Sequence, residues 1–266
     1  MTELTSAKKS PVSVIIPTCD RPHSMLLEAV HSVLGQSCPP TEVIIVDNGT
    51  VAADVEGLPK EVLYFRIAPR VGASIARNFG AAFSKGRFIA FLDDDDVWSS
   101  NFISDCLERL AQENAKCVYS SIFQMGPETP ICLAQPSSEN FTVKGLLRRN
   151  VGASGQNFVI CKDLFWTVGG FDKDLVVSED RDLGIRVILS GAKIRFSTKA
   201  KVFMRPSDGR ERLTSHHPRR FALLWKYKSY LGLKDVLILS VVFSASQIKR
   251  QLAKVVLRYP FGATKF

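Results

Sequence analysis

The fold of this chain is decided by residues 88–96, which read Phe88-Ile89-Ala90-Phe91-Leu92-Asp93-Asp94-Asp95-Asp96. Five apolar residues in a row predict a buried strand, and four carboxylates follow directly at its end. Ligands of an open α/β sheet bind outside the carboxyl ends of its strands. Adjacent like charges need a counter-charge, and carboxylate oxygens suit Mg²⁺ or Mn²⁺, so we predict a metal site here. The alternative is a solvated acidic turn that caps the next helix at Ser100 or Asn101.

Strands and helices alternate along the rest of the chain. Apolar, β-branched runs predict strands at 12–16, 43–46, 63–67, 117–121, 158–161 and 193–196. Helical spacing predicts helices at 22–34, 73–85, 102–112 and 179–190, with a short one from 163. The stretch 125–140, rich in Pro and Ser, is expected to be a loop. This alternation predicts an α/β fold with a mostly parallel sheet and helices on both of its faces.

Composition separates a neutral body from a basic tail. The net charge is +9, yet residues 219–266 hold ten Lys or Arg and one acid, which leaves 25 of each in residues 1–218. An anionic surface is therefore the expected partner, and nucleic acid is not, because no basic strand is interleaved with aromatics. The six cysteines show no metal-finger spacing and are expected to be reduced. The polar first ten residues predict no signal peptide, hence a cytoplasmic protein.

The tail also has apolar segments of its own. Residues 236–245 are apolar but too few to span a bilayer. Residues 248–257 predict a basic amphipathic helix, which would make the protein peripheral at the inner face of the plasma membrane. The alternative is a terminal helix that docks on the body.

Seven segments, in order, resemble the family 2 glycosyltransferases of the GT-A fold. They are Val14–Arg21, Ser32–Ser37, Glu42–Thr50, Ala76–Asn78 with Gly80, Gly86–Trp98, Gly169–Asp172 and Glu179–Arg186. The resemblance implies a Rossmann-like GT-A domain over residues 1–218, with a nucleotide-binding half at about 11–120 and an acceptor half at about 121–218. The tail, residues 219–266, lies outside it.

The resemblance implies where a UDP-type donor would bind. Asp47 would pair with the base, Pro17, Thr18 and Asp20 would line the same pocket, and Arg77 would hold base or diphosphate. The residues themselves leave two alternatives open. Asp47 can close an Asx turn over Asp-Asn-Gly, and Arg77 can form an ion pair with the clustered acids.

The family's D-x-D motif maps onto Asp93 and Asp95. Residues i and i+2 of an extended segment point the same way, so these two can face one ligand. Asp95 is expected to bind the metal directly, with Asp93 reaching the ribose or a metal-bound water and Asp94 beside the donor. In some relatives a histidine completes the metal shell, and His217 is the candidate, although adjacent histidines in a basic loop are also typical of a solvated surface.

The resemblance places the general base at Asp180, with Glu179 as the second candidate. The base would take the proton from an acceptor hydroxyl as its oxygen attacks the anomeric carbon. A purely structural role is the alternative, because acids stabilise helix N-termini and Ser178 could be the cap. Asp182 is the third candidate after these two, and Arg186, one turn later, is expected to pair with an acid of this set.

Together these features predict an inverting, metal-dependent glycosyltransferase. It would transfer a sugar from a nucleotide-sugar to a hydroxyl of a surface glycan or lipid-linked oligosaccharide. The alternatives are a non-catalytic nucleotide-sugar or glycan binder on the same fold and a metal-dependent nucleotidyltransferase. The latter would need a Gly-rich phosphate loop after the first strand, and residues 18–22 contain no glycine. A redox enzyme is disfavoured because no G-x-G-x-x-G follows a strand.

Overall fold

The computed structural model describes residues 9–206 and 220–232. The strands are β1 (Val12–Thr18), β2 (Glu42–Asp47), β3 (Val62–Arg66), β4 (Phe88–Phe91), β5 (Val97–Trp98), β6 (Cys117–Gln124), β7 (Ile131–Ala134), β8 (Phe158–Cys161) and β9 (Ile194–Met204). The α-helices are α1 (His23–Leu34), α2 (Ala73–Phe83), α3 (Phe102–Ala111), α4 (Val143–Arg148), α5 (Lys162–Thr167), α6 (Glu179–Leu189) and α7 (Arg220–Lys226). Short 3₁₀ turns are η1 (Gln112–Asn114) and η4 (Lys228–Tyr230).

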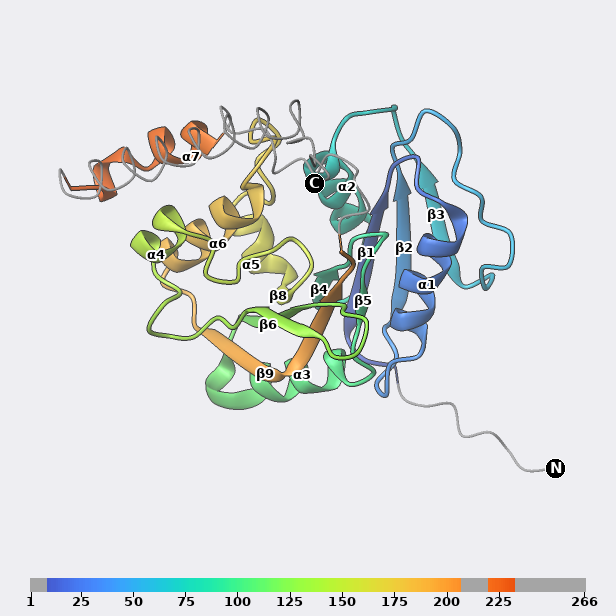
Figure 1. The fold of residues 1–266 in the computed structure, drawn as a ribbon, viewed down its shortest axis with the longest axis horizontal. Coiled ribbons are helices and arrows are strands. Elements are labelled where there is room, and N and C mark those ends of the chain that lie inside the picture. Colours follow the sequence, from blue (N-terminus) through green and yellow to red (C-terminus); the bar gives the residue numbers. More distant parts are fainter. Residues whose placement is uncertain (1–8, 207–219, 233–266) are drawn as a thin grey trace, which may run out of the picture. The chain divides into compact units, whose positions relative to one another are not determined.

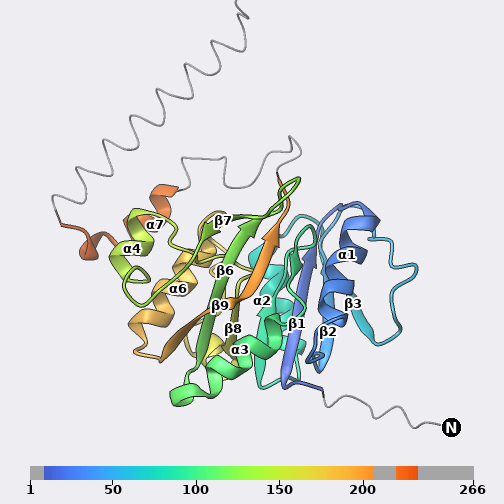
Figure 2. The ribbon, with the colours of Figure 1, turned by 60° about the horizontal axis from the view of Figure 1, so that its bottom comes forward.

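The nine strands form one sheet in the order β3-β2-β1-β4-β8-β6-β9-β5, with β7 paired to β6 (Figures 1 and 2). The first four strands of that order are parallel, β8 is antiparallel to both of its neighbours, and β6 and β9 are parallel to each other. The sheet is therefore mixed but mostly parallel, as the alternation of strands and helices predicts.

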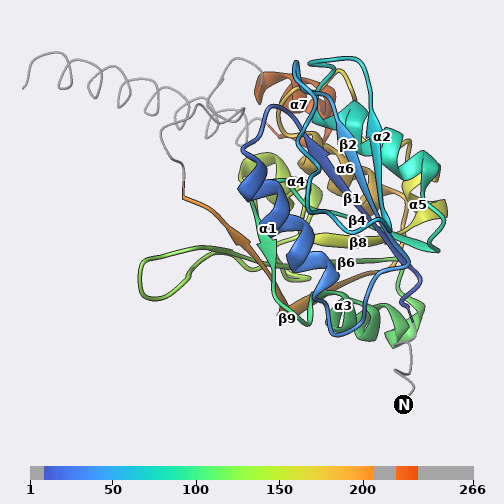
Figure 3. The same cartoon turned by 90° about the vertical axis from the view of Figure 1, so that its right-hand side faces the viewer.

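Helices cover both faces of this sheet (Figure 3). On one face α1 packs on β1 and α3 packs on β9 and β6, and alternate residues of β1, such as Val14 and Ile16, belong to the same buried core. On the other face α2 lies so close to β1 that a Cβ on Gly80 would be 2.5 Å from Ile15 Cγ2. Phe91, on the same face, contacts three further aromatic rings, those of Phe158, Phe165 and Phe171. Alternate strand residues thus supply two cores, which fixes the strand register.

Four parts of the fold differ from the sequence prediction, and the first is β5, where no strand was expected. The expected loop 125–140 contains β7, which pairs with residues 122–124 of β6. β9 runs to Met204, far beyond residue 196, because a bulge opposite Ser120 and Ser121 carries the polar residues that interrupt its apolar pattern. α4 was not expected, because it has only six residues, but the Thr142 hydroxyl caps it by accepting from the Gly145 amide at 3.0 Å.

The chain divides into two compact units, Met1–Leu224 and Trp225–Phe266. The predicted amphipathic helix at 248–257 and His217 lie outside the described residues. Within the described residues no helix has the length and apolarity needed to cross a membrane. The six cysteines are unbonded in the structure, and Cys106, Cys117 and Cys161 are buried.

Candidate active site

The ends of three parallel strands meet at one edge of the sheet. Thr18 at the end of β1 is in register with Asp47 at the end of β2. The Leu92 amide, just beyond β4, donates to the Ile15 carbonyl at 3.0 Å, so the four aspartates begin beside the last residues of β1. The predicted donor-side residues of β1, β2 and the acidic run therefore lie at the carboxyl edge, where open α/β sheets bind ligands.

The acidic run is a turn, and the assumption of an extended segment is wrong. The Asp96 amide donates to the Asp93 carbonyl at 3.2 Å, which closes the chain on itself. The side chains nevertheless alternate: those of Asp93 and Asp95 are 32% and 34% exposed, whereas Asp94 and Asp96 are buried. Asp93 and Asp95 are thus the two members of the run that a ligand can reach.

Asp94 is fixed by Thr18, the last residue of β1, and by Arg21, which follows the strand. Its carboxylate accepts from the Thr18 hydroxyl at 2.6 Å and from Arg21 Nε at 2.8 Å. Burial raises the pKa of Asp94 to about 6, although the Arg21 charge and the Thr18 hydrogen bond act in the opposite direction. Arg21 also contacts Asp95, at 3.1 Å. Asp94 and Thr18 therefore tie β1 to the acidic run.

Asp96 ties the run to two later segments. It accepts from Gln156 Nε2 at 2.6 Å, just before β8, and from the Arg205 amide at 2.8 Å, just after β9. Burial, followed by the charges of Asp93 and Asp95, raises the pKa of Asp96 to about 7. Asp96 thus holds three chain segments together at the sheet edge, a role that is structural.

The raised pKa of Asp96 gives a stability prediction. Between about pH 4, where an unfolded aspartate titrates, and about pH 7, the folded protein keeps a proton that the unfolded chain has lost. The free energy of unfolding should therefore fall as pH rises through this window, by up to about 1.4 kcal/mol per pH unit from this group. Asp96→Asn should remove that part of the slope and be more stable than the wild type above pH 7. Urea unfolding in EDTA across this range measures it.

Two features keep that test specific. Gln156 Oε1 is buried without a hydrogen-bond partner, so a rotated Gln156 amide could accept from the amide introduced by Asp96→Asn. The exposed carboxyl of Asp163 in α5 provides the matched control, Asp163→Asn, which should keep the wild-type slope. An Asp96→Asn protein with the full wild-type slope would show that Asp96 is ionised in the folded state.

Arg77 of α2 connects the acidic run to α6. Its side chain is 5% exposed; Nη2 contacts Asp93 at 2.6 Å and Nη1 contacts Glu179 at 3.0 Å. The guanidinium lies 5.2 Å from the ring centroid of Phe171, and Nε is buried without a partner. The ion pair that the sequence left open as an alternative is therefore formed, and Arg77 neutralises one carboxylate on each side of the site.

Asp180 follows Glu179 in the first turn of α6. Its carboxylate accepts from the Arg181 amide at 2.7 Å. Burial, and then the neighbouring charge of Glu179, raise the pKa of Asp180 well above the usual carboxyl range. Ser178 precedes the helix but its side chain does not cap it, so that expectation is wrong. Arg186 pairs with Asp182 at 2.6 Å, as expected.

Asp47 and Asp20 organise the loop after β2. Asp47 is buried and closes the predicted Asx turn, accepting from the Gly49 amide at 2.7 Å, and it also accepts from the Ala53 amide and the Tyr64 hydroxyl. Asp20 has a left-handed backbone, and its carboxylate accepts from the Thr50 and Val51 amides at 2.7 and 3.2 Å. These hydrogen bonds, that from Val51 first, hold the pKa of Asp20 below its usual range.

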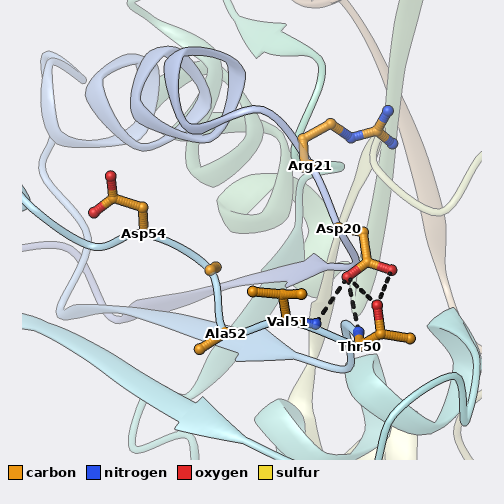
Figure 4. Close-up of a pocket in the computed structure, with 7 residues that line it drawn as sticks. Asp20, Arg21, Thr50, Val51, Ala52 and Asp54 are labelled. Carbon is orange, nitrogen blue, oxygen red and sulfur yellow. Dashed lines mark hydrogen bonds between the residues drawn. The ribbon is translucent and has the colours of Figure 1, made fainter.

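An open pocket of about 500 Å³ lies between the loops that follow β1 and β2 (Figure 4). It is lined by Asp20, Arg21, Thr50, Val51, Ala52, Ala53 and Asp54. Figure 4 shows Asp20 directed at the Thr50 and Val51 amides, while Arg21 is directed away from them. The pocket thus brings Asp20 together with loop residues that the sequence did not single out, and Asp47 forms part of the scaffold behind it.

Asp93 and Asp95 offer the oxygen ligands that a divalent cation prefers, but two carboxylates do not fill its coordination shell. Asp95 and Asp93 are oxygen donors at a strand end, and Mg²⁺ commonly uses only one or two carboxylates together with substrate phosphates. Across residues 9–206 and 220–232, no three His, Cys, Asp or Glu side chains form a group that could hold a metal ion. A divalent cation bound here would therefore need phosphate oxygens of a substrate as further ligands.

Sequence reasoning missed the supports behind these residues. Asn78 of α2 and Phe171 exchange two hydrogen bonds, Asn78 Nδ2 to the Phe171 carbonyl at 2.8 Å and the Phe171 amide to Asn78 Oδ1 at 2.9 Å. Gly170 has φ +64°, and a Cβ there would be 2.8 Å from Asn78 Oδ1. Both segments belong to the motifs that carry the family resemblance, but their spacing alone does not reveal that they meet.

The glycosyl transferase family 2 model matches residues 13–169, which is more than half of the chain. The chain belongs to this family. It is 29% identical over 150 residues to Bacillus subtilis TuaG, named as a teichuronic acid biosynthesis glycosyltransferase, covering 54% of this chain and 59% of TuaG. It is 28% identical over 114 residues to an Escherichia coli glucosyltransferase, WfgD, covering 41% of this chain and 45% of WfgD. The chain thus spans less than two thirds of both relatives.

A solved structure confirms the fold class. Staphylococcus aureus TarS superposes on the chain with a TM-score of 0.59 at 19% identity, covering 74% of this chain and 37% of TarS. The family match and this structural likeness agree with the mostly parallel GT-A sheet and with the family 2 resemblance drawn from the seven segments.

Proposed function

We propose that this chain transfers a sugar, with inversion, from a UDP-type nucleotide-sugar to a hydroxyl acceptor. The observation that carries the proposal is the Arg77 bridge between Asp93, at the end of β4, and Glu179, at the start of α6. A single buried cation places the donor-side carboxylates next to the pair of acids that includes the proposed base. A direct displacement needs donor and base on opposite sides of one reacting carbon, held at short range.

The donor would lie along the carboxyl edge of the sheet. Its base would occupy the pocket beside Asp20, with Asp47 and Pro17 behind it, and its diphosphate would approach Asp93, Asp95 and Arg77. The name of WfgD specifies UDP-glucose as that relative's donor and a sugar diphosphoundecaprenol as its acceptor. This supports a UDP-type donor and, for the acceptor, a lipid-linked oligosaccharide or growing surface glycan at the inner face of the plasma membrane.

The residues in the site divide the chemistry between them. Asp180 would accept the proton of the acceptor hydroxyl, and its raised pKa suits a base that works near neutral pH. Arg77 would exchange part of its contact with Asp93 for a phosphate oxygen of the donor. A Mg²⁺ or Mn²⁺ ion held by Asp95, with Asp93 beside it, would stabilise the charge on the departing nucleoside diphosphate.

A donor screen tests the proposed reaction. Purified protein with Mn²⁺ is incubated with individual nucleotide-sugars, with and without a lipid-diphosphate sugar acceptor, and the released nucleotide is measured. UDP release that depends on the acceptor is the expected result. Tight nucleotide-sugar binding without release from any donor would instead favour the non-catalytic binder. Formation of pyrophosphate in a parallel reaction with a nucleoside triphosphate and a sugar 1-phosphate would favour the nucleotidyltransferase.

Asp95→Ala should abolish metal-dependent donor binding. Asp95 is exposed enough to meet a ligand and its run begins at the strand end, so its loss removes the proposed direct metal ligand while the buried Asp94 and Asp96 keep the turn in place. Calorimetric titration of UDP with and without Mn²⁺ measures the effect. Asp105→Ala in α3, which contacts no residue of the acidic run, is the control. Undiminished Mn²⁺-dependent binding by Asp95→Ala would refute the assignment.

A further inference from the structure

Trp225, Lys228 and Tyr230 are exposed side chains within six residues of the second unit, and we call them the aromatic–basic cluster. Trp225 is 72% exposed and Tyr230 is 42% exposed. Lys228 Nζ lies 4.1 Å from the ring centroid of Trp225, the geometry of a cation–π contact. The cluster therefore presents a large apolar ring and a fixed positive charge together at the surface.

The sequence that contains the cluster is basic, and the first acidic residue after it is Asp235. Residues 219–234 contain Arg219, Arg220, Lys226, Lys228 and Lys234 and no acidic residue. A single exposed apolar side chain needs no explanation, but an exposed tryptophan that carries a lysine on its ring within an all-basic segment is unusual for a surface that faces only water. Tryptophan and tyrosine prefer the boundary between water and bilayer, where one part of the ring is apolar and the other is hydrated.

We propose that the aromatic–basic cluster binds the surface of an anionic lipid bilayer. The rings of Trp225 and Tyr230 would enter the headgroup region, and Lys228 would contact acidic headgroups next to them. A bilayer satisfies both features at once, whereas nucleic acid would use the charge but leave no apolar phase for the Trp225 ring. The inference builds on the proposed transfer to a lipid-linked acceptor, because it brings the enzyme to the phase in which that acceptor lies.

Tryptophan fluorescence offers a direct readout on the full chain. The chain has three tryptophans: Trp98 is 4% exposed and stacked on Phe102, and Trp166 is 40% exposed in α5. In a Trp166→Phe background the emission change reports on Trp225, with Trp98 as a constant contribution. Phosphatidylglycerol-containing vesicles should shift this emission to the blue, pure phosphatidylcholine vesicles should do so much less, and added salt should weaken the shift.

Variants locate the contact. Trp225→Ser and Lys228→Glu should each lower co-sedimentation with the anionic vesicles by about tenfold. Leu133→Ser in β7 and Lys60→Glu in the loop after β2 are matched changes at exposed positions and should bind like the wild type. Equal vesicle binding by wild type, Trp225→Ser and Lys228→Glu, or no blue shift with anionic vesicles, would overturn the inference.

The outcome is separable from that of the donor screen. Vesicle binding by a protein that releases nucleotide from no donor would leave the bilayer contact standing and refute the proposed transfer. Acceptor-dependent nucleotide release by a protein that ignores anionic vesicles would refute the bilayer contact and leave the transfer standing.

Discussion

Asp180→Asn is expected to lower the rate of sugar transfer by about 10²–10⁴-fold while donor binding changes little. Asparagine keeps the size and the hydrogen bond from the Arg181 amide but cannot accept the acceptor's proton. The effect should therefore appear in kcat at saturating donor, and the UDP affinity from titration should stay near the wild-type value. Steady-state kinetics with both substrates and a parallel UDP titration measure the two quantities.

The pH profile gives the same prediction a second readout. A base works only when deprotonated, and burial and the Glu179 charge raise the pKa of Asp180. The wild-type rate should therefore fall as pH decreases through a value well above the usual carboxyl range, and this limb should be missing from the residual activity of Asp180→Asn.

Glu179→Gln is the control for the base. Glu179 already accepts from Arg77 at 3.0 Å, so its carboxylate is engaged in holding a cation and is less suited to receive a proton. Its loss should reduce the rate by less than the loss of Asp180 does. If Asp180→Asn were nearly as active as the wild type and Glu179→Gln were inactive, the general base would be Glu179 and this prediction would be wrong.

The strands and helices that build the sheet could be predicted because each is stabilised by a local pattern. β1 is rich in β-branched residues, β4 is a continuous apolar run, and α2 begins after Gly72 and ends before Gly86. Their bounds therefore fall within a few residues of the expected ones. β7 and the long end of β9 could not be predicted in the same way. Both form because they pair with β6. Their own sequences do not indicate a strand, since β7 is flanked by prolines and the second half of β9 begins with polar residues.

The sequence predicts which residues lie in the site better than it predicts the contacts between them. A strand that ends in carboxylates indicates where Asp93 and Asp95 lie, but the partners of the run come from elsewhere in the sequence. Arg21 follows β1, Arg77 lies in α2, and Gln156 precedes β8. Which aspartate meets a ligand and which holds the scaffold is decided by these long-range contacts, and no spacing within residues 93–96 encodes it.

Gly155 shows how such a contact constrains a position far away in sequence. A Cβ at Gly155 would be 2.8 Å from both Cζ and Nη2 of Arg77, so only glycine leaves room for the guanidinium between Asp93 and Glu179. The chain at Gly155 thus forms one wall of the Arg77 slot, and Phe171 lies beside the guanidinium as well.

Arg77→Ala should lower the free energy of unfolding by about 3 kcal/mol, because it leaves Asp93 and Glu179 without their cation. This value is near the lower end of the cost of unpairing a buried charge, since both carboxylates are partly exposed and water replaces part of the lost interaction. Arg77→Ala should also weaken UDP binding, since the remaining carboxylates repel the diphosphate. Gly155→Ala should weaken UDP binding in the same direction by displacing the guanidinium. Urea unfolding and UDP titration measure both effects.

The double variant decides whether Gly155 acts through Arg77. If the added methyl group matters only because it displaces the guanidinium, Gly155→Ala should have almost no further effect on UDP binding in the Arg77→Ala background, and the two single effects should be strongly non-additive. Fully additive effects would mean that Gly155 contacts the donor or shapes the loop before β8 independently of Arg77. In that case Gly155 would not be what holds the Arg77 guanidinium between Asp93 and Glu179.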